Sequence, residues 1–274
     1  MSYIVVGFDF SSGSAIAVDL AIDIANRWQS NIRLVYVKER NEDEAPIRSE
    51  IERRNAGVAH LLKGIRLDYT IRSGKVSEEL TAQADEDNAT LIIVGTHGMS
   101  GLTNRWIGRN TYRTIAESKV PVLSLREDFN FSKDLERIVL PLDSTDDTRQ
   151  KVPTAMHFAK TFGSEIHIFG LYTSSAPDIR NVVNSYVSQT QKLLDKAGIK
   201  HQTKMHDVQK NLTTETLEFA DEINADLIVI MTEQENSLSN LLLGSFAHQM
   251  IEQSKIPILT VRPEQLTLSA GGHF

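Results

Sequence analysis

The sequence contains no cysteine. A chain without thiols forms neither a disulfide framework nor a thiolate metal site, and it fits a reducing compartment. Long apolar runs are also lacking, since none approaches the roughly 20 residues that span a bilayer. The first residues, Met1–Val6, lack the basic region and the small-residue cleavage site of a signal peptide. We therefore expect a cytoplasmic protein with no membrane partner.

Basic residues are in the minority. The chain holds 29 Lys and Arg against 36 Asp and Glu, which gives a net charge of −7. Nonspecific nucleic-acid binding depends on a basic surface, so we expect no nucleic-acid partner. The charge is uneven: residues 1–134 hold 17 basic and 19 acidic residues (−2), and residues 135–274 hold 12 and 17 (−5).

What the chain does contain is an internal repeat. Tyr3–Asp9 matches Arg137–Asp143 at a shift of 134 residues. Nearer the end of each unit the shift is 136, and Ser118–Leu125 matches Ser254–Val261. A period of this length is too long for a solenoid and indicates that a whole domain is duplicated.

The repeat predicts the domain boundaries: a first unit at residues 1–130, a second at 135–263, and a C-terminal tail at 264–274. Within each unit, short apolar runs rich in β-branched residues alternate with amphipathic segments. This alternation predicts parallel strands joined by helices that cover both faces of a sheet.

A proline opens the last apolar run of each unit, at Pro121 and Pro257. Proline lacks a backbone donor, so it suits the first residue of an edge strand. Two exposed edges are a liability that mutual pairing removes. We therefore expect the repeats to dock as an intramolecular dimer through Val122–Leu125 and Ile258–Val261. A homodimer of the whole chain is left open.

A glycine-rich loop follows the apolar run 91–95. Gly95, Gly98 and Gly108 have the spacing Gly-x2-Gly-x9-Gly. Ligands of open α/β sheets lie beyond the carboxyl ends of the strands, and Asp9 ends the first strand of the same unit. Glycine allows close backbone approach, and successive N–H groups before a helix attract an anion. The loop therefore predicts an anion site.

With this loop, the strand-end Asp and the duplication, the whole chain resembles the universal stress protein family in its tandem form. The resemblance implies an α/β fold of two tandem open parallel five-stranded sheets, with helices on both faces and strand order 3-2-1-4-5. Such domains are Rossmann-like and similar to adenine nucleotide alpha hydrolases. It also implies a stress-response protein that binds ATP or AMP, with Mg²⁺ only beside ATP. No catalytic constellation and no metal site of its own is predicted, so at most very slow ATP hydrolysis is expected.

The same resemblance implies the contacts. In the family, strand-end residues hold the base, the residue before the loop and its first glycine lie at the ribose, and later glycines and hydroxyls hold the phosphates. The implied nucleotide-binding residues are Gly7, Asp9 and Val37 at the base, Val94 and Gly95 at the ribose, and Gly98, Gly108, Arg109, Asn110 and Thr111 at the phosphates.

Arg109 departs from the family pattern, which has Ser at this position. A guanidinium binds phosphate bidentately, or its bulk fills the pocket. The second outcome defines the alternative function, an interaction or other-ligand-binding stress protein that takes no nucleotide. Asp9 has two interpretations as well, since it either selects the base or only caps the Ser11–Ser14 turn.

The second repeat has lost the glycines. At a shift of 136, Met231 and Gln234 take the places of Gly95 and Gly98. Side chains there obstruct backbone approach to a phosphate. The loop 231–247 also carries two acids and no base, whereas the first loop carries two arginines and no acid. We expect a degenerate second site with an architectural role.

Overall fold

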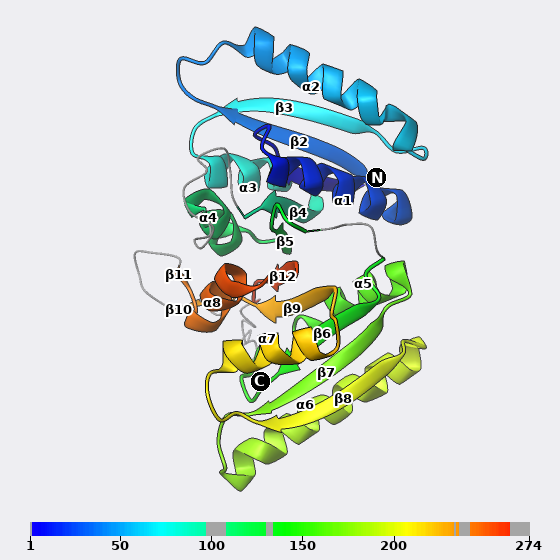
Figure 1. Cartoon of the computed structure of the whole chain (residues 1–274), viewed down its shortest axis with the longest axis vertical. Helices are drawn as coiled ribbons and strands as arrows, with labels where there is room; N and C mark the ends of the chain where they lie inside the picture. The colour runs from blue at the N-terminus through cyan, green and yellow to red at the C-terminus, as the bar shows by residue number, and fades with distance from the viewer. Residues whose placement is uncertain (1, 97–107, 130–133, 233, 236–241, 264–274) are drawn as a thin grey trace, which may run out of the picture.

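The computed structural model describes residues 2–96, 108–129, 134–232, 234–235 and 242–263. Helices and strands alternate along both halves of the chain (Figure 1). The first half consists of β1 (Tyr3–Gly7), α1 (Ser12–Trp28), β2 (Asn31–Lys38), α2 (Glu44–Val58), a 3-10 turn η1 (Ala59–Leu61), β3 (Leu67–Ser73), α3 (Val76–Glu86), β4 (Ala89–Gly95), α4 (Arg109–Glu117) and β5 (Val122–Leu125).

The second half repeats this order. It consists of β6 (Arg137–Leu142), α5 (Val152–Phe162), β7 (Glu165–Tyr172), α6 (Pro177–Ala197), β8 (His201–Asp207), α7 (Leu212–Glu222), β9 (Leu227–Met231), the short β10 (Gln234–Glu235) and β11 (Leu242–Leu243), α8 (Ser245–Gln253) and β12 (Ile258–Val261). None of the helices in the described part of the chain is long and apolar enough to cross a bilayer.

The main sheet runs through both halves. Its strand order is β3-β2-β1-β4-β5-β12-β9-β6-β7-β8. Each half thus has the order 3-2-1-4-5 that the resemblance implies, and the strands within a half are parallel. Because the two last strands pair with each other, the two expected five-stranded sheets form one ten-stranded sheet.

The junction is antiparallel. Leu259 lies opposite Leu123, and Thr260 lies opposite Val122. Two buried hydroxyls strengthen the contact, since Ser124 Oγ donates to the carbonyl of Ile258 at 3.3 Å and Thr260 Oγ1 donates to the carbonyl of Val122 at 3.0 Å. Both edges that would otherwise expose unpaired backbone groups are thereby satisfied.

Among the residues that the structure describes, four helices cover each face of the main sheet. Buried side chains of α1, α2, α5 and α6 share one hydrophobic core with the strands, and those of α3, α4, α7 and α8 share the other. Each core contains residues from both halves. The protein is therefore a three-layer structure, with helices on both faces of the sheet (Figure 1). Its two cores extend across the junction.

The start of α1 positions the candidate site. Ser11 caps the helix, because its Oγ accepts a hydrogen bond from the N–H of Ser14 at 3.1 Å. Ala17, Leu20 and Ile24 are fully buried at helical spacing, so this face holds the helix against the sheet. The segment between β1 and α1 is thus only a few residues long, and it lies at the carboxyl end of β1.

Candidate functional site

A large cavity opens at the carboxyl ends of β1, β2 and β4. β1 lies between β2 and β4 in the sheet, and the helices that leave these strands lie on opposite faces. Such a switch point forms a crevice where open α/β sheets bind their ligands. The cavity measures about 1070 Å³. It is therefore large enough for a ligand of nucleotide size.

The cavity gathers the residues that the sequence singles out. The predicted residues among those that line it are Gly7, Asp9, Val37, Val94, Gly95, Gly108, Arg109, Asn110 and Thr111. Gly98 lies outside the described residues. The structure thus brings residues from four separate segments to one place, and their contact with a nucleotide stays a prediction.

Asp9 is held in a tight turn. Its Oδ1 accepts hydrogen bonds from the N–H of Ser11 at 3.1 Å and from Ser11 Oγ. Asp143 makes the same two bonds with Thr145 in the second half. The capping role of this Asp is therefore common to both halves, while in the first half Asp9 also lines the large cavity.

The first turn of α4 lies at the cavity, and the first N–H groups of a helix have no partner within the helix itself. Gly108 is the N-cap, and no acidic residue lies in the first turn of this helix. Thr111 fixes the turn to the sheet, because its Oγ1 donates to the carbonyl of Gly95 at 2.8 Å. The N–H of Gly108 donates to the carbonyl of Thr96, also at 2.8 Å. The helix end is thus a rigid, partly positive group suited to an anion.

Arg109 is exposed at this helix end and is one of the residues that line the cavity. An exposed side chain at the wall of a space of about 1070 Å³ does not fill that space. The guanidinium instead adds a full positive charge beside the positive end of α4. Asn110, the next residue, is exposed as well.

The end of β2 and the loop after it form a wall of the cavity that was not predicted from the sequence. Lys38, Glu39, Arg40, Asn41 and Glu42 all line the cavity. Glu42 organises this loop, since it accepts hydrogen bonds from Tyr36 Oη at 2.8 Å and from the N–H of Glu39 at 3.1 Å. Burial, with the bond to Glu42, raises the pKa of Tyr36 to about 12. Charged residues directly after a strand, at the edge of the sheet where ligands bind, were the sequence signal that could have identified this wall.

Comparison with known proteins decides the family. The profile of the universal stress protein family matches residues 1–126 and again residues 135–262. The chain belongs to the universal stress protein family. Universal stress protein MJ0531 of Methanocaldococcus jannaschii is 26% identical over 46% of this chain and 82% of its own length. Universal stress protein YxiE of Bacillus subtilis is 28% identical over 44% of this chain and 96% of its own length.

The tandem universal stress protein fold is also found in solved structures. The crystal structure of a universal stress protein from Archaeoglobus fulgidus has a TM-score of 0.74 against this chain. It covers 95% of this chain and 98% of its own, at 18% sequence identity. Similarity at this level supports the ten-stranded two-repeat architecture and is a statement about fold alone.

Among the described residues of this universal stress protein's second half, the equivalent place holds only a small cavity. About 20 Å³ remains there. Most residues around it are the repeat counterparts of those around the large cavity, with Met231 for Gly95, Phe246 for Asn110 and Pro141 for Gly7. The bulkier side chains therefore close the second site.

Lys151 is a further residue at the closed site. Its side chain is buried, and its Nζ donates to the carbonyl of Thr148 at 2.8 Å. The helix α5 starts at Val152, whereas the repeat places the counterpart of Ser12 at Asp146. The intervening turn thus brings Lys151 to the wall of the small cavity. No group of acidic and histidine side chains suited to a metal ion exists among the described residues of either half.

Proposed function

We propose that this universal stress protein binds an adenine nucleotide, ATP or AMP, in its first half and uses its second half as an architectural partner. The observation that carries the proposal is the contrast between the two equivalent places. One is a cavity of about 1070 Å³ walled by the predicted residues, and the other retains about 20 Å³.

The chemistry of the first cavity supports an anionic ligand with an apolar ring. Val37 and Val94 supply apolar walls near Asp9, and the end of α4 supplies N–H donors and positive charge. The apolar walls suit the base, and the end of α4 suits the phosphates. When ATP is the ligand, Mg²⁺ would accompany its phosphates. The proposed role is binding that responds to stress, and no catalytic step is assigned to any residue.

The alternative is a stress protein that takes another ligand or none. In that alternative the Arg109 guanidinium occupies the nucleotide pocket. The exposed position of Arg109 gives this version little support. A different anion in the same cavity is compatible with the same groups, so the ligand must be identified directly.

The experiment exploits a natural difference between the halves. Asn110 becomes Phe246 in the closed second site, so Asn110→Phe transfers one closing element to the first site. We expect isothermal titration to show ATP or AMP binding by the wild type and at least about tenfold weaker binding by Asn110→Phe. The matched control, Asn110→Ala, removes the same amide without filling space, so it should bind the nucleotide more tightly than Asn110→Phe.

Mass spectrometry of small molecules released from the denatured wild type completes the test. Recovery of ATP or AMP supports the proposal. If neither nucleotide is released and neither binds in titration, the nucleotide function is wrong. If binding occurs but Asn110→Phe leaves it unchanged, the nucleotide lies elsewhere and the assignment of this cavity fails.

A further inference from the structure

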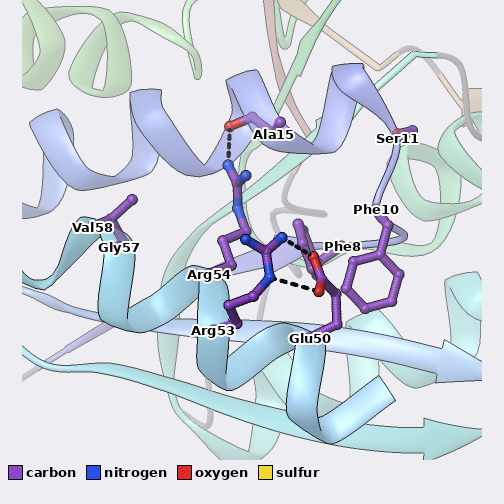
Figure 2. Close-up of a pocket in the computed structure, with 9 residues that line it drawn as sticks. All are labelled: Phe8, Phe10, Ser11, Ala15, Glu50, Arg53, Arg54, Gly57 and Val58. Atoms are coloured by element: carbon purple, nitrogen blue, oxygen red, sulfur yellow. Dashed lines mark hydrogen bonds and ion pairs between the residues drawn. The ribbon is translucent and has the colours of Figure 1, made fainter. Parts of the chain in front are cut away.

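A second cavity lies between α1 and α2, separate from the proposed nucleotide site (Figure 2). It measures about 380 Å³, which is within the range of roughly 300–1,000 Å³ for small-molecule sites. Phe8, Phe10, Ala15 and Val58 give it apolar walls. Arg54, on the α2 side, brings a cationic group to the same space.

Arg54 has donors to spare. A guanidinium carries five N–H groups. Nη2 of Arg54 donates to the carbonyl of Ala15 at 3.1 Å and lies 3.9 Å from Asp19 Oδ1. Its Nε is buried and has no hydrogen-bond partner among the described residues. The Arg54 side chain is nevertheless 25% exposed, so other N–H groups of its guanidinium can meet an anionic acceptor in the cavity.

The other charged groups of the cavity compensate each other. Arg53 Nε donates to Glu50 Oε2 at 2.8 Å, and a second bond joins Nη2 to Oε1. This bidentate pair is visible in Figure 2 beside Arg54. Arg54 is therefore the one lining cation without a carboxylate partner among the lining residues, and its contact with Asp19, outside the lining, is long at 3.9 Å. A negative charge on the ligand would give Arg54 a closer partner.

The aromatic walls indicate what the rest of the ligand would be. The rings of Phe8 and Phe10 meet edge to face with centroids 5.0 Å apart. Phe10 has a φ of 62°, which is rare for a bulky residue, and the Asp9–Ser11 turn holds it there. This conformation places the Phe10 ring at the cavity (Figure 2). The pocket thus combines one cation with an apolar surface.

The second half lacks this combination. At the shift of 134, Ser188 stands for Arg54, Ser144 for Phe10 and Leu142 for Phe8. The second half folds into the same arrangement of strands and helices without these side chains. The cation and the aromatic pair are therefore not a requirement of the duplicated fold.

We propose that this cavity binds a small organic monoanion of the carboxylate class. Its carboxylate would accept from Arg54, and its short hydrocarbon body would pack against Phe8 and Phe10. Phe8 and Ser11 line both cavities, so the two sites are neighbours. The inference stands without the proposed nucleotide function, because none of its supporting contacts involves the glycine loop or α4.

The test uses hexanoate as the probe and the uncharged 1-hexanol as its counterpart. Methyl NMR spectra of the full chain should show saturable shifts of Ala15 and Val58 on titration with hexanoate and much weaker binding of hexanol. Arg54→Leu should weaken hexanoate binding by about tenfold or more, since it removes a charge-assisted bond. Arg48→Leu, the matched control on the same helix but outside the cavity lining, should change it little.

A second pair of variants, at Gly57, tests whether hexanoate binds in this cavity without changing the charge of its lining. A Cβ at Gly57 meets no atom within 4 Å, and Gly57 lines the cavity. Gly57→Phe should fill the space and abolish binding, whereas Gly57→Ala should retain it, and both should keep the wild-type melting temperature or raise it. Unsaturable shifts, or hexanoate binding that persists in both Arg54→Leu and Gly57→Phe, would overturn the proposal.

Discussion

Arg109 is the residue at which this chain departs from its family pattern. It is the first residue of α4, exposed at the wall of the large cavity. A positive side chain at a helix N-terminus repels the helix dipole, so it costs some stability. That cost is recovered only if an anion lies between the two positive groups, which is the arrangement expected for bound phosphates.

Charge reversal at this position tests the phosphate side of the cavity. We expect Arg109→Glu to weaken ATP binding by about tenfold or more, because a carboxylate repels the phosphates. Arg109→Ser, which restores the family residue, should retain ATP binding. Adenosine has no phosphate, so isothermal titration should show little effect of either variant on its affinity. Equal ATP affinity in the wild type and Arg109→Glu would remove Arg109 from the site.

Nine of the ten residues predicted from the sequence line the cavity, but the physical reason for each was not predicted. Gly95 was predicted for close approach to a ligand. In the structure a Cβ there would lie 3.0 Å from the backbone carbon of Gly13, so the packing of α1 already requires glycine. Lys151 could not be foreseen, because the repeat alignment assumes that α5 begins where α1 does. The later start of α5 depends on tertiary packing.

At the scale of elements, β7 carries a buried titratable side chain. His167 is 7% exposed, and its Nε2 lies 3.0 Å from Glu165 Oε2. Burial lowers the pKa of His167 from its ordinary value, and Glu165 offsets only part of that effect. The folded state therefore binds this proton less readily than the unfolded chain does.

Protonation of His167 at low pH should therefore lower the free energy of unfolding. Stability from His167 is complete above its unfolded pKa, near 6.5, and is lost as the pH falls through the lower folded pKa. His167→Val should therefore show a smaller loss of unfolding free energy between pH 7.5 and 5.5 than the wild type. Urea denaturation at the two pH values measures it. His60→Val, on the exposed η1 turn, should keep the wild-type difference, and an unchanged slope in His167→Val would refute the assignment.

Helix ends were predicted less well than helix positions. The segment after the acidic run 39–44 is predicted from the sequence to form a helix near 46–63, and α2 spans Glu44–Val58. It begins earlier because Asp43 caps it, with Oδ1 accepting from the N–H of Ala45 at 3.1 Å. The pairing of β5 with β12 was expected from edge-strand proline alone. Its antiparallel direction and register depend on how the two halves face each other, which a repeat pattern does not contain.

At the scale of the whole molecule, the halves are joined on every layer. β5 pairs with β12 in the sheet. On one face Trp28 Nε1 donates to Thr161 Oγ1 at 2.7 Å, and on the other Tyr112 Oη accepts from the N–H of Leu243 at 3.1 Å. Because each core also contains residues of both halves, neither half can lose its packing without exposing apolar surface of the other.

This architecture predicts cooperative unfolding of the two repeats. Leu259 is fully buried at the junction opposite Leu123, so Leu259→Asp would bury a charge there and cost about 3 kcal/mol or more. In a Trp106→Phe background, Trp28 fluorescence reports the contact of α1 with α5 of the second half, far from the substitution in sequence. Urea unfolding followed by fluorescence and by far-UV circular dichroism should give one coincident transition, shifted to lower urea.

The exposed Lys255, four residues earlier, provides the matched control. Lys255→Asp introduces the same side chain outside the core and should leave the transition near that of the wild type. If Leu259→Asp instead splits the curve, so that circular dichroism retains a second transition at the wild-type urea concentration after the Trp28 contact is lost, then the first repeat is stable by itself and the shared sheet does not couple the halves. A shared shift means that the second repeat, although its own site is closed, stabilises the fold that carries the open cavity. This is a physical reason for the second repeat to be retained.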